Sequence, residues 1–84
     1  IWIGDAAYLN QGYGAKMMSI AIDRAFADPR VEAIVIDPLN SNTDAHRFYQ
    51  RLGFRPIGRR LFEDDDCLVH RLDRADWRLG DTDA

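Results

Sequence analysis

The chain has 84 residues, a formal net charge of -3 and a hydrophobic share of 46%. A chain of this length forms one small domain with a modest core. The mildly acidic balance argues against a nucleic-acid partner, and no apolar run approaches the roughly 18 residues of a membrane helix. The single cysteine, Cys67, excludes an internal disulfide, predicts a buried strand residue rather than a metal ligand, and fits a cytoplasmic protein.

The first half of the chain predicts a strand, a helix and a second strand. Residues 1–3 are β-prone, and because the chain opens inside this strand we expect the N-terminal strands of the fold to be missing. Apolar residues recur at three- and four-residue spacing from Ala15, which predicts a helix that ends at Asp28-Pro29. The apolar run within residues 31–36 predicts a strand covered on both faces.

The second half predicts a helix followed by a hairpin. Ser41 or Asn42 is expected to cap the helix, and Gly53 is expected to end it. Residues 54–62 and 66–72 are predicted to be two strands joined by an acidic turn.

Two further features complete the prediction of the fold. Pro56 has no N–H to donate, so it is expected on an edge strand or at a bulge. Residues 75–84 are expected to form a polar tail that frays. The order strand, helix, strand, helix, strand, strand predicts an α/β fold, a mixed sheet with helices covering it.

Two glycines, Gly12 and Gly14, stand where a loop enters the first helix. Unpaired N–H groups and the helix dipole at such a position favour an anion. Two glycines before a helix are equally often a tight turn that binds no ligand. A phosphate-binding P-loop would need Ser or Thr directly after Lys16, and a dinucleotide fingerprint would need glycine at Met17. Both of these nucleotide motifs are therefore disfavoured.

Two segments together resemble the GNAT acetyltransferase superfamily. The first, Gln11-Gly12-Tyr13-Gly14-Ala15-Lys16, is similar to the pyrophosphate loop [RQ]-x-x-G-x-[GA], with lysine at the last position. The second, from Asn42 to Phe54, is similar to N-x-x-A-x-x-x-Y-x-x-x-G-F. The lead-in Gly4-Asp5 resembles the aminoglycoside 6'-N-acetyltransferase branch. Residues 1–74 are thus expected to be the C-terminal part of a GNAT domain.

The resemblance implies acetyl-CoA as co-substrate and a primary amine, aminoglycoside-like, as acceptor. It implies that Asn42 hydrogen-bonds the cofactor and that Tyr49 donates a proton to the departing thiolate. The residues it implies for pyrophosphate binding are Gln11, Gly12, Tyr13, Gly14, Ala15 and Lys16. The general base of that branch lies upstream of Ile1, so we expect this chain alone to be inactive.

Other interpretations of these residues stay open. Judged by spacing, Tyr49 is more often a core aromatic, and Asn42 could only cap its helix. Asp5 suits a strand-end turn better than a catalytic role. The acidic run from Glu63 to Asp66 could attract a polycationic acceptor, but is more often a solvated turn.

Three interpretations concern the protein as a whole. The acceptor could instead be a hydroxylysine-type siderophore precursor, or the chain could be a non-catalytic acyl-CoA-binding fragment. An exposed strand edge at residues 1–3 would favour a homodimer. Neither His46 nor His70 has a sequence context that argues for catalysis.

Overall fold

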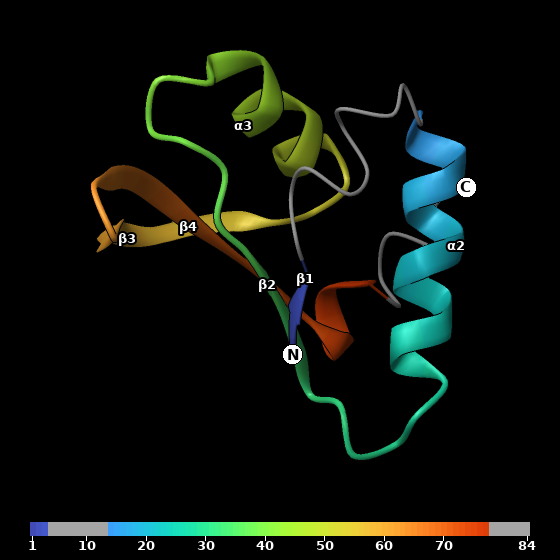
Figure 1. Ribbon diagram of the computed structural model, residues 1–84. Coiled ribbons are helices and arrows are strands. Elements are labelled where there is room, and N and C mark those ends of the chain that lie inside the picture. Colours follow the sequence, from blue (N-terminus) through green and yellow to red (C-terminus); the bar gives the residue numbers. More distant parts are fainter. Residues whose placement is uncertain (4–13, 78–84) are drawn as a thin grey trace.

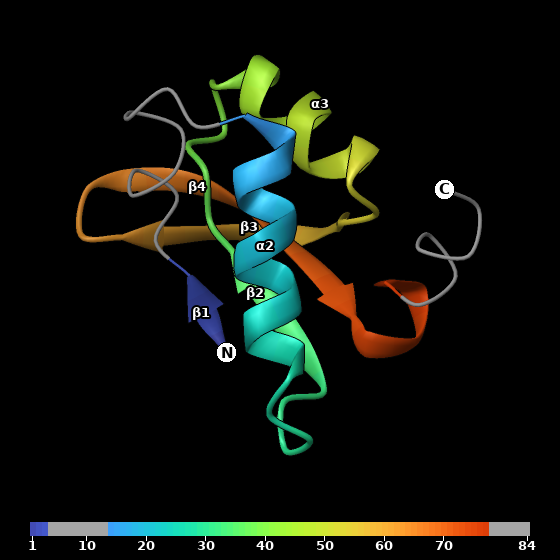
Figure 2. The same ribbon diagram turned by 90° about the vertical axis from the view of Figure 1, so that its right-hand side faces the viewer.

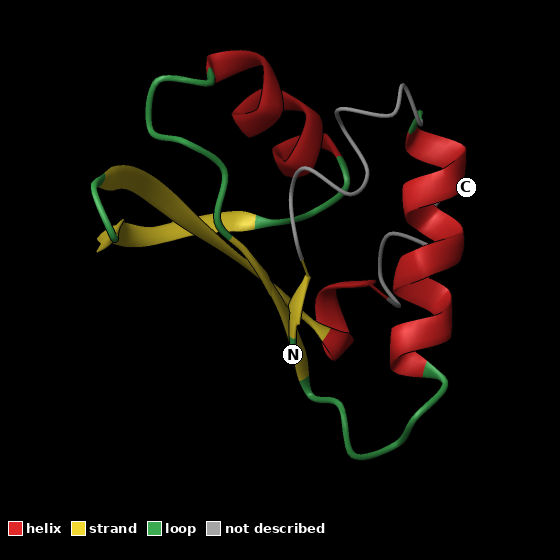
Figure 3. Ribbon diagram, viewed as in Figure 1, coloured by secondary structure: helices red, strands yellow, loops and turns green. Residues whose placement is uncertain are grey.

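The computed structural model describes residues 1–3 and 14–77. Its elements are β1 (Trp2–Ile3), α2 (Ala15–Phe26), β2 (Ala33–Ile36), α3 (Thr43–Arg51), β3 (Arg55–Phe62) and β4 (Asp65–Asp73). A helical turn at residues 74–77 follows β4. The predicted order of strands and helices is confirmed (Figure 3).

The strands form one mixed sheet in the order β1-β2-β4-β3. The first pair, β1 and β2, is parallel, whereas β2–β4 and β4–β3 are antiparallel. Helix α2 connects the parallel pair and lies across β2 (Figures 1 and 2). Both parallel strands therefore end at the same end of the sheet, and α2 begins there.

Both helices pack on the same face of this sheet. Ile34 and Ile36 of β2 lie opposite Leu72 and His70 of β4, and all four side chains are fully buried. Because side chains alternate along a strand, these residues share one face. The core cluster on that face comprises Met18, Ile22, Phe26, Ile34, Ile36, Ala45, Tyr49, Phe54 and Leu72.

The opposite face is less covered than the sequence predicts. Ala33 on this face of β2 is buried but Val35 is only half-buried, so the expected cover of both faces is incomplete at Val35. A hollow of about 430 Å³ opens on this side, and its floor includes Trp2, Val35, Ile57 and Val69. Apolar composition alone could not separate a covered face from an open one.

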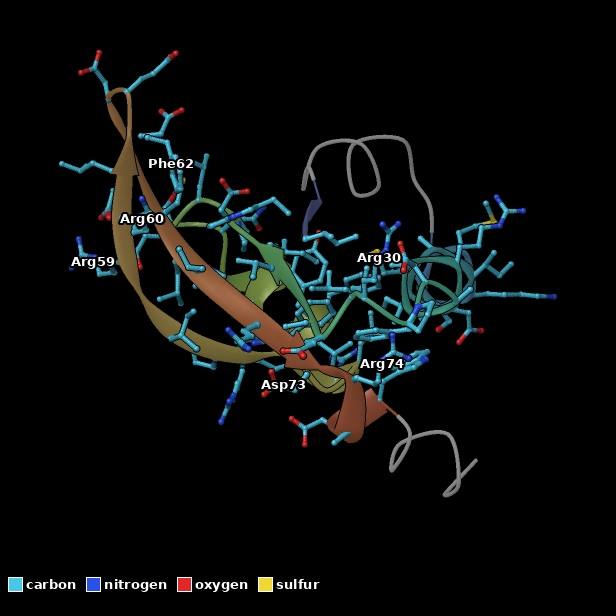
Figure 4. All side chains as sticks on the ribbon, turned by 90° about the horizontal axis from the view of Figure 1, so that it is seen from below. Arg30, Arg59, Arg60, Phe62, Asp73 and Arg74 are labelled. Carbon is cyan, nitrogen blue, oxygen red and sulfur yellow. The ribbon has the colours of Figure 1, made fainter. Side chains whose placement is uncertain are left out.

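The sheet curls over this open face so that its two edge strands meet. The rings of Trp2 in β1 and Phe62 in β3 lie 5.9 Å apart between centroids, edge to face. The Arg60 guanidinium lies 5.2 Å from the Phe62 ring and 5.9 Å from the Trp2 ring. Figure 4 shows the strong curvature of β3 and β4.

Local signals fix the ends of α3 and the hairpin. Gly53 follows α3 with φ +108°, a conformation that glycine adopts without strain. The predicted irregularity at Pro56 is confirmed, because the register of edge strand β3 shifts between Pro56 and Gly58. Glu63 turns the hairpin with a positive φ of 57°.

The first residues after β4 pack against the core, although a fraying tail was expected from residue 75 onward. Trp77 is half-buried against the core, and its indole Nε1 donates to Asp23 of α2 at 2.8 Å. Residues 75–77 therefore do not behave as a fraying tail; residues 78–84 lie outside the described part. Within the described ranges, no helix has the length and apolarity needed to cross a membrane.

Candidate active site

The start of α2 is suited to an anion. Gly14 is the N-cap residue, with φ -88° and ψ -173°, and its carbonyl accepts the first helical bond from the Met18 N–H at 3.2 Å. Glycine has no side-chain oxygen to accept hydrogen bonds from the N–H groups of the first turn that follows it, and within the described residues no side chain caps this end of α2. Lys16 is exposed in this first turn, which contains no acidic residue. The helix dipole and the lysine both favour negative charge here.

The glycine at position 14 is not required by the fold around it. Its φ is one that any residue adopts, and a Cβ built on it would meet no described atom within 4 Å. An exposed position with free space and an ordinary backbone usually tolerates larger residues. A glycine there leaves room for a ligand to approach the backbone closely.

Three of the six predicted loop residues can be placed. Gly14, Ala15 and Lys16 form the cap and the first turn of α2, and all three are exposed. Gln11, Gly12 and Tyr13 lie outside the described residues, as do Gly4 and Asp5 of the lead-in.

Asn42 caps α3, as one of its two interpretations predicts. Its Oδ1 accepts a hydrogen bond of 3.2 Å from the Ala45 N–H, and Asp44 adds a negative charge in the first turn. The N-terminus of α3 is therefore already provided with an acceptor and a charge, unlike that of α2. The Asn42 side chain is also exposed, so capping leaves its amide nitrogen accessible.

Tyr49 is fully buried on α3 and belongs to the core cluster. Its ring packs edge to face against Phe48 at 5.3 Å and against Phe54 at 5.6 Å. The core interpretation of its ring is thus confirmed, and it leaves open what its hydroxyl does. Helix α3 and the start of α2 lie at the same end of the sheet, where β1 and β2 end (Figures 1 and 2).

One buried histidine lies beside Tyr49. His70 of β4 is fully buried, and its ring centroid is 6.3 Å from that of Tyr49. Its Nδ1 is 3.0 Å from the Leu68 carbonyl oxygen, and its Nε2 is 3.3 Å from the Gln50 amide nitrogen. A carbonyl only accepts and an amide nitrogen only donates, so these partners assign the proton to Nδ1 and a lone pair to Nε2.

The acidic hairpin is partly neutralised by arginines of the sheet. Asp66 is ion-paired with Arg59 across the hairpin, and the hydrogen bond from that guanidinium lowers the pKa of the Asp66 carboxyl. Glu63, Asp64 and Asp65 are exposed at the turn. Of the acidic run, one carboxylate thus already has a cationic partner, which favours the solvated-turn interpretation.

A sequence profile settles the family of this chain. The family described as the Acetyltransferase (GNAT) domain matches residues 1–62. The chain belongs to the GNAT acetyltransferases. The resemblance predicted from the glycine loop and from the segment around Tyr49 is confirmed.

Individual relatives of this GNAT chain are named for aminoglycosides. A kanamycin resistance protein of Rhizobium radiobacter is 36% identical over 56 residues, which make up 67% of this chain and 52% of that protein. An aminoglycoside N(6')-acetyltransferase type 1 of Klebsiella pneumoniae is also 36% identical over 56 residues, 28% of its length. The same values hold for the enzyme of that name from Serratia marcescens.

A solved structure shares the fold. The crystal structure of aminoglycoside acetyltransferase AAC(6')-Ib in complex with coenzyme A matches with a TM-score of 0.74 and 29% identity. The match covers 89% of this chain and 43% of that one. The GNAT chain thus spans about half or less of the length of each relative, and the expectation of a partial GNAT fold is confirmed.

Sequence reasoning missed the contacts of the two histidines in this GNAT chain. The rings of His46 on α3 and His70 on β4 lie 5.3 Å apart. The available signal was the spacing of His46, Tyr49 and Gln50, which puts them on one helical face. Which strand residue that face meets depends on the register of β4, which the sequence alone did not specify. Among the described residues there is no group of three or more side chains suited to a metal ion.

Proposed function

We propose that the protein is an acetyl-CoA-dependent N-acetyltransferase that acts on a primary amine of an aminoglycoside-like acceptor. The observation that carries this is the start of α2 in a GNAT fold, where a glycine cap without a side-chain acceptor, the N–H groups of the first helical turn and Lys16 favour an anion. The relatives named for kanamycin and aminoglycosides support this acceptor class over a siderophore precursor. We also propose a cytoplasmic location.

The cofactor would be held at two helix starts. The pyrophosphate of acetyl-CoA would accept hydrogen bonds from backbone N–H groups of residues 11–16, and the Lys16 ammonium would add a favourable charge. The Asn42 amide nitrogen, exposed beside its capping oxygen, would donate to the same cofactor. The coenzyme A bound in the AAC(6')-Ib structure supports this choice of ligand.

The reaction forms a C–N bond and breaks the thioester C–S bond. The neutral amine attacks the thioester carbonyl carbon, the amine proton passes to a base, and the CoA thiolate leaves. We propose that Tyr49 protonates that thiolate, because a phenolic O–H can act as a general acid toward a thiolate within hydrogen-bond reach. The ring packing against Phe48 and Phe54 would hold the hydroxyl in place.

Calorimetric titration of the chain with acetyl-CoA tests the cofactor site. A Gly14→Val variant should weaken binding by about tenfold or more, because the added methyl groups would occupy the space of a close phosphate. Ala27→Val is the control, since it places a valine side chain at the exposed opposite end of α2. Its affinity should equal that of the unmodified chain.

A second pair of variants tests the charge. Lys16→Gln should weaken binding and reduce its salt dependence, whereas Arg24→Gln in the last turn of α2 should change neither. No binding by a chain shown to be folded by circular dichroism would contradict the proposed cofactor site. Equal losses in Gly14→Val and Ala27→Val would show that the effect is one of helix stability.

A further inference from the structure

The face of α3 that carries Tyr49 packs against His70 of β4. His46, Tyr49 and Gln50 stand at positions i, i+3 and i+4, which lie together on a helix. All three contact His70: the rings of His46 and Tyr49 lie 5.3 Å and 6.3 Å from its ring, and the Gln50 amide lies 3.3 Å from its Nε2. His70 therefore lies at the centre of the contact between this part of α3 and the sheet.

These contacts differ in how strongly they fix direction. The packing of Tyr49 against Phe48 and Phe54 is apolar and holds the ring through shape, because the hydrophobic effect itself has no preferred direction. The Gln50–His70 hydrogen bond is directional, and the His70 ring is itself held by the Leu68 carbonyl at 3.0 Å. Two successive hydrogen bonds thus link the Leu68 backbone in β4, through His70, to Gln50, the residue that follows Tyr49.

We propose that His70 is a positioning residue for Tyr49. Through Gln50 it fixes the rotation of α3 about its axis, and with it the location of the Tyr49 hydroxyl. This inference rests on the proposed role of Tyr49 as proton donor. Proton transfer needs the two heavy atoms within about 3 Å, so a small rotation of α3 is enough to slow the reaction.

Kinetics of the acetyltransferase that carries this chain test the proposal, with acetyl-CoA and kanamycin as substrates. His70→Leu keeps most of the buried volume and removes both ring nitrogens. It should lower kcat about tenfold while the KM for acetyl-CoA stays within about twofold. His70→Gln, whose amide oxygen can accept from Gln50, should recover most of kcat.

The decisive measurement repeats His70→Leu in a Tyr49→Phe background. If His70 acts through the Tyr49 hydroxyl, the second substitution should change kcat by less than about twofold there. Equal losses of kcat with and without the hydroxyl would overturn the proposal, because the effect would then be structural. A Tyr49→Phe enzyme with unchanged kcat would instead overturn the role of Tyr49, which separates the two failures.

A second variant avoids any disturbance of the core. Gln50 is exposed, so Gln50→Ala removes the hydrogen bond to His70 without changing the buried ring. It should lower kcat about threefold, again only when the Tyr49 hydroxyl is present. Arg47→Ala, an exposed substitution on another face of α3, is the control and should leave kcat unchanged. A Gln50→Ala enzyme as active as this control would also overturn the proposal.

Discussion

The Arg74 guanidinium donates a hydrogen bond of 2.9 Å to the Phe26 carbonyl oxygen and lies 5.0 Å from the centre of the Phe26 ring. The same group donates to the carbonyl oxygens of Asp28 at 2.8 Å and Val31 at 2.7 Å. Figure 4 shows Arg74 between the end of β4 and α2. One side chain thus satisfies the last turn of α2 and the loop that leads into β2.

Replacing Arg74 should therefore destabilise the fold markedly. Arg74→Met keeps the aliphatic stem but leaves these carbonyl groups without their donor, and should lower the free energy of unfolding by about 2 kcal/mol. Arg74→Lys should recover only part of this loss, because one ammonium cannot reach all three carbonyls. Urea denaturation followed by circular dichroism measures both.

The matched control is Arg30→Met. The Arg30 side chain is exposed, and its hydrogen-bond partner within the described ranges is the neighbouring Asp28 carboxylate, so its loss should change stability much less. Similar midpoints for Arg30→Met and Arg74→Met would contradict the structural role given to Arg74.

Substitutions at Asn42 can separate capping of α3 from binding of the cofactor. Asn42→Ala should lower the free energy of unfolding by about 1 kcal/mol, since it removes the acceptor for the Ala45 N–H. Asn42→Asp keeps that acceptor, so stability should be retained. Its negative charge and its lost amide donor should nevertheless weaken acetyl-CoA binding in calorimetry.

Ser41→Asp controls for the charge, because it adds the same carboxylate at the exposed position immediately before. If Asn42 contacts the cofactor directly, Asn42→Asp should weaken binding more than Ser41→Asp. Equal effects of the two aspartates would leave Asn42 as a helix cap alone.

The Asp66–Arg59 pair predicts a dependence of stability on acid. The Arg59 hydrogen bond lowers the pKa of Asp66 in the folded chain, so the carboxylate contributes stability above its ordinary pKa, near 4. This contribution is lost as the pH falls through the lowered value. Unfolding measured from pH 2 to pH 7 should show Asp66→Asn less stable than the unmodified chain at neutral pH and equal to it at the acid end.

The pair is exposed, so its effect should also shrink at high salt. A difference between Asp66→Asn and the unmodified chain that persists undiminished at pH 2 would contradict an ionic origin. It would point to a packing change in the hairpin instead.

The sequence predicted the local elements well because each carries its own signals. Asn42 marks the start of α3 and Gly53 follows its end, as their capping preferences predict. Pro56 lies at a register shift in edge strand β3, as expected for a residue without an N–H. What it could not predict depends on contacts between distant segments. The half-open face at Val35 and the packing of Trp77 on α2 are set by which elements cover the sheet.

The candidate site divides in the same way. Sequence motifs, which depend on residue type and spacing along the chain, predicted Gly14, Lys16, Asn42 and Tyr49 as site residues. The sequence did not predict His70 as a site residue, because its contact with Tyr49 depends on the strand register that places β4 beside α3. A residue that acts through its neighbour in space leaves no pattern in its neighbours in sequence.

The contact between Trp2 and Phe62 also bears on the order in which the chain can assemble. The first strand gains its aromatic and cationic neighbours only after β4 has formed, because β4 lies between β2 and β3 in the sheet. The contact of Trp2 with Phe62 would thus form only after the chain had been made through β4, which ends at Asp73. In a Trp77→Phe chain, the Trp2 indole would report the formation of this contact as a change in its fluorescence.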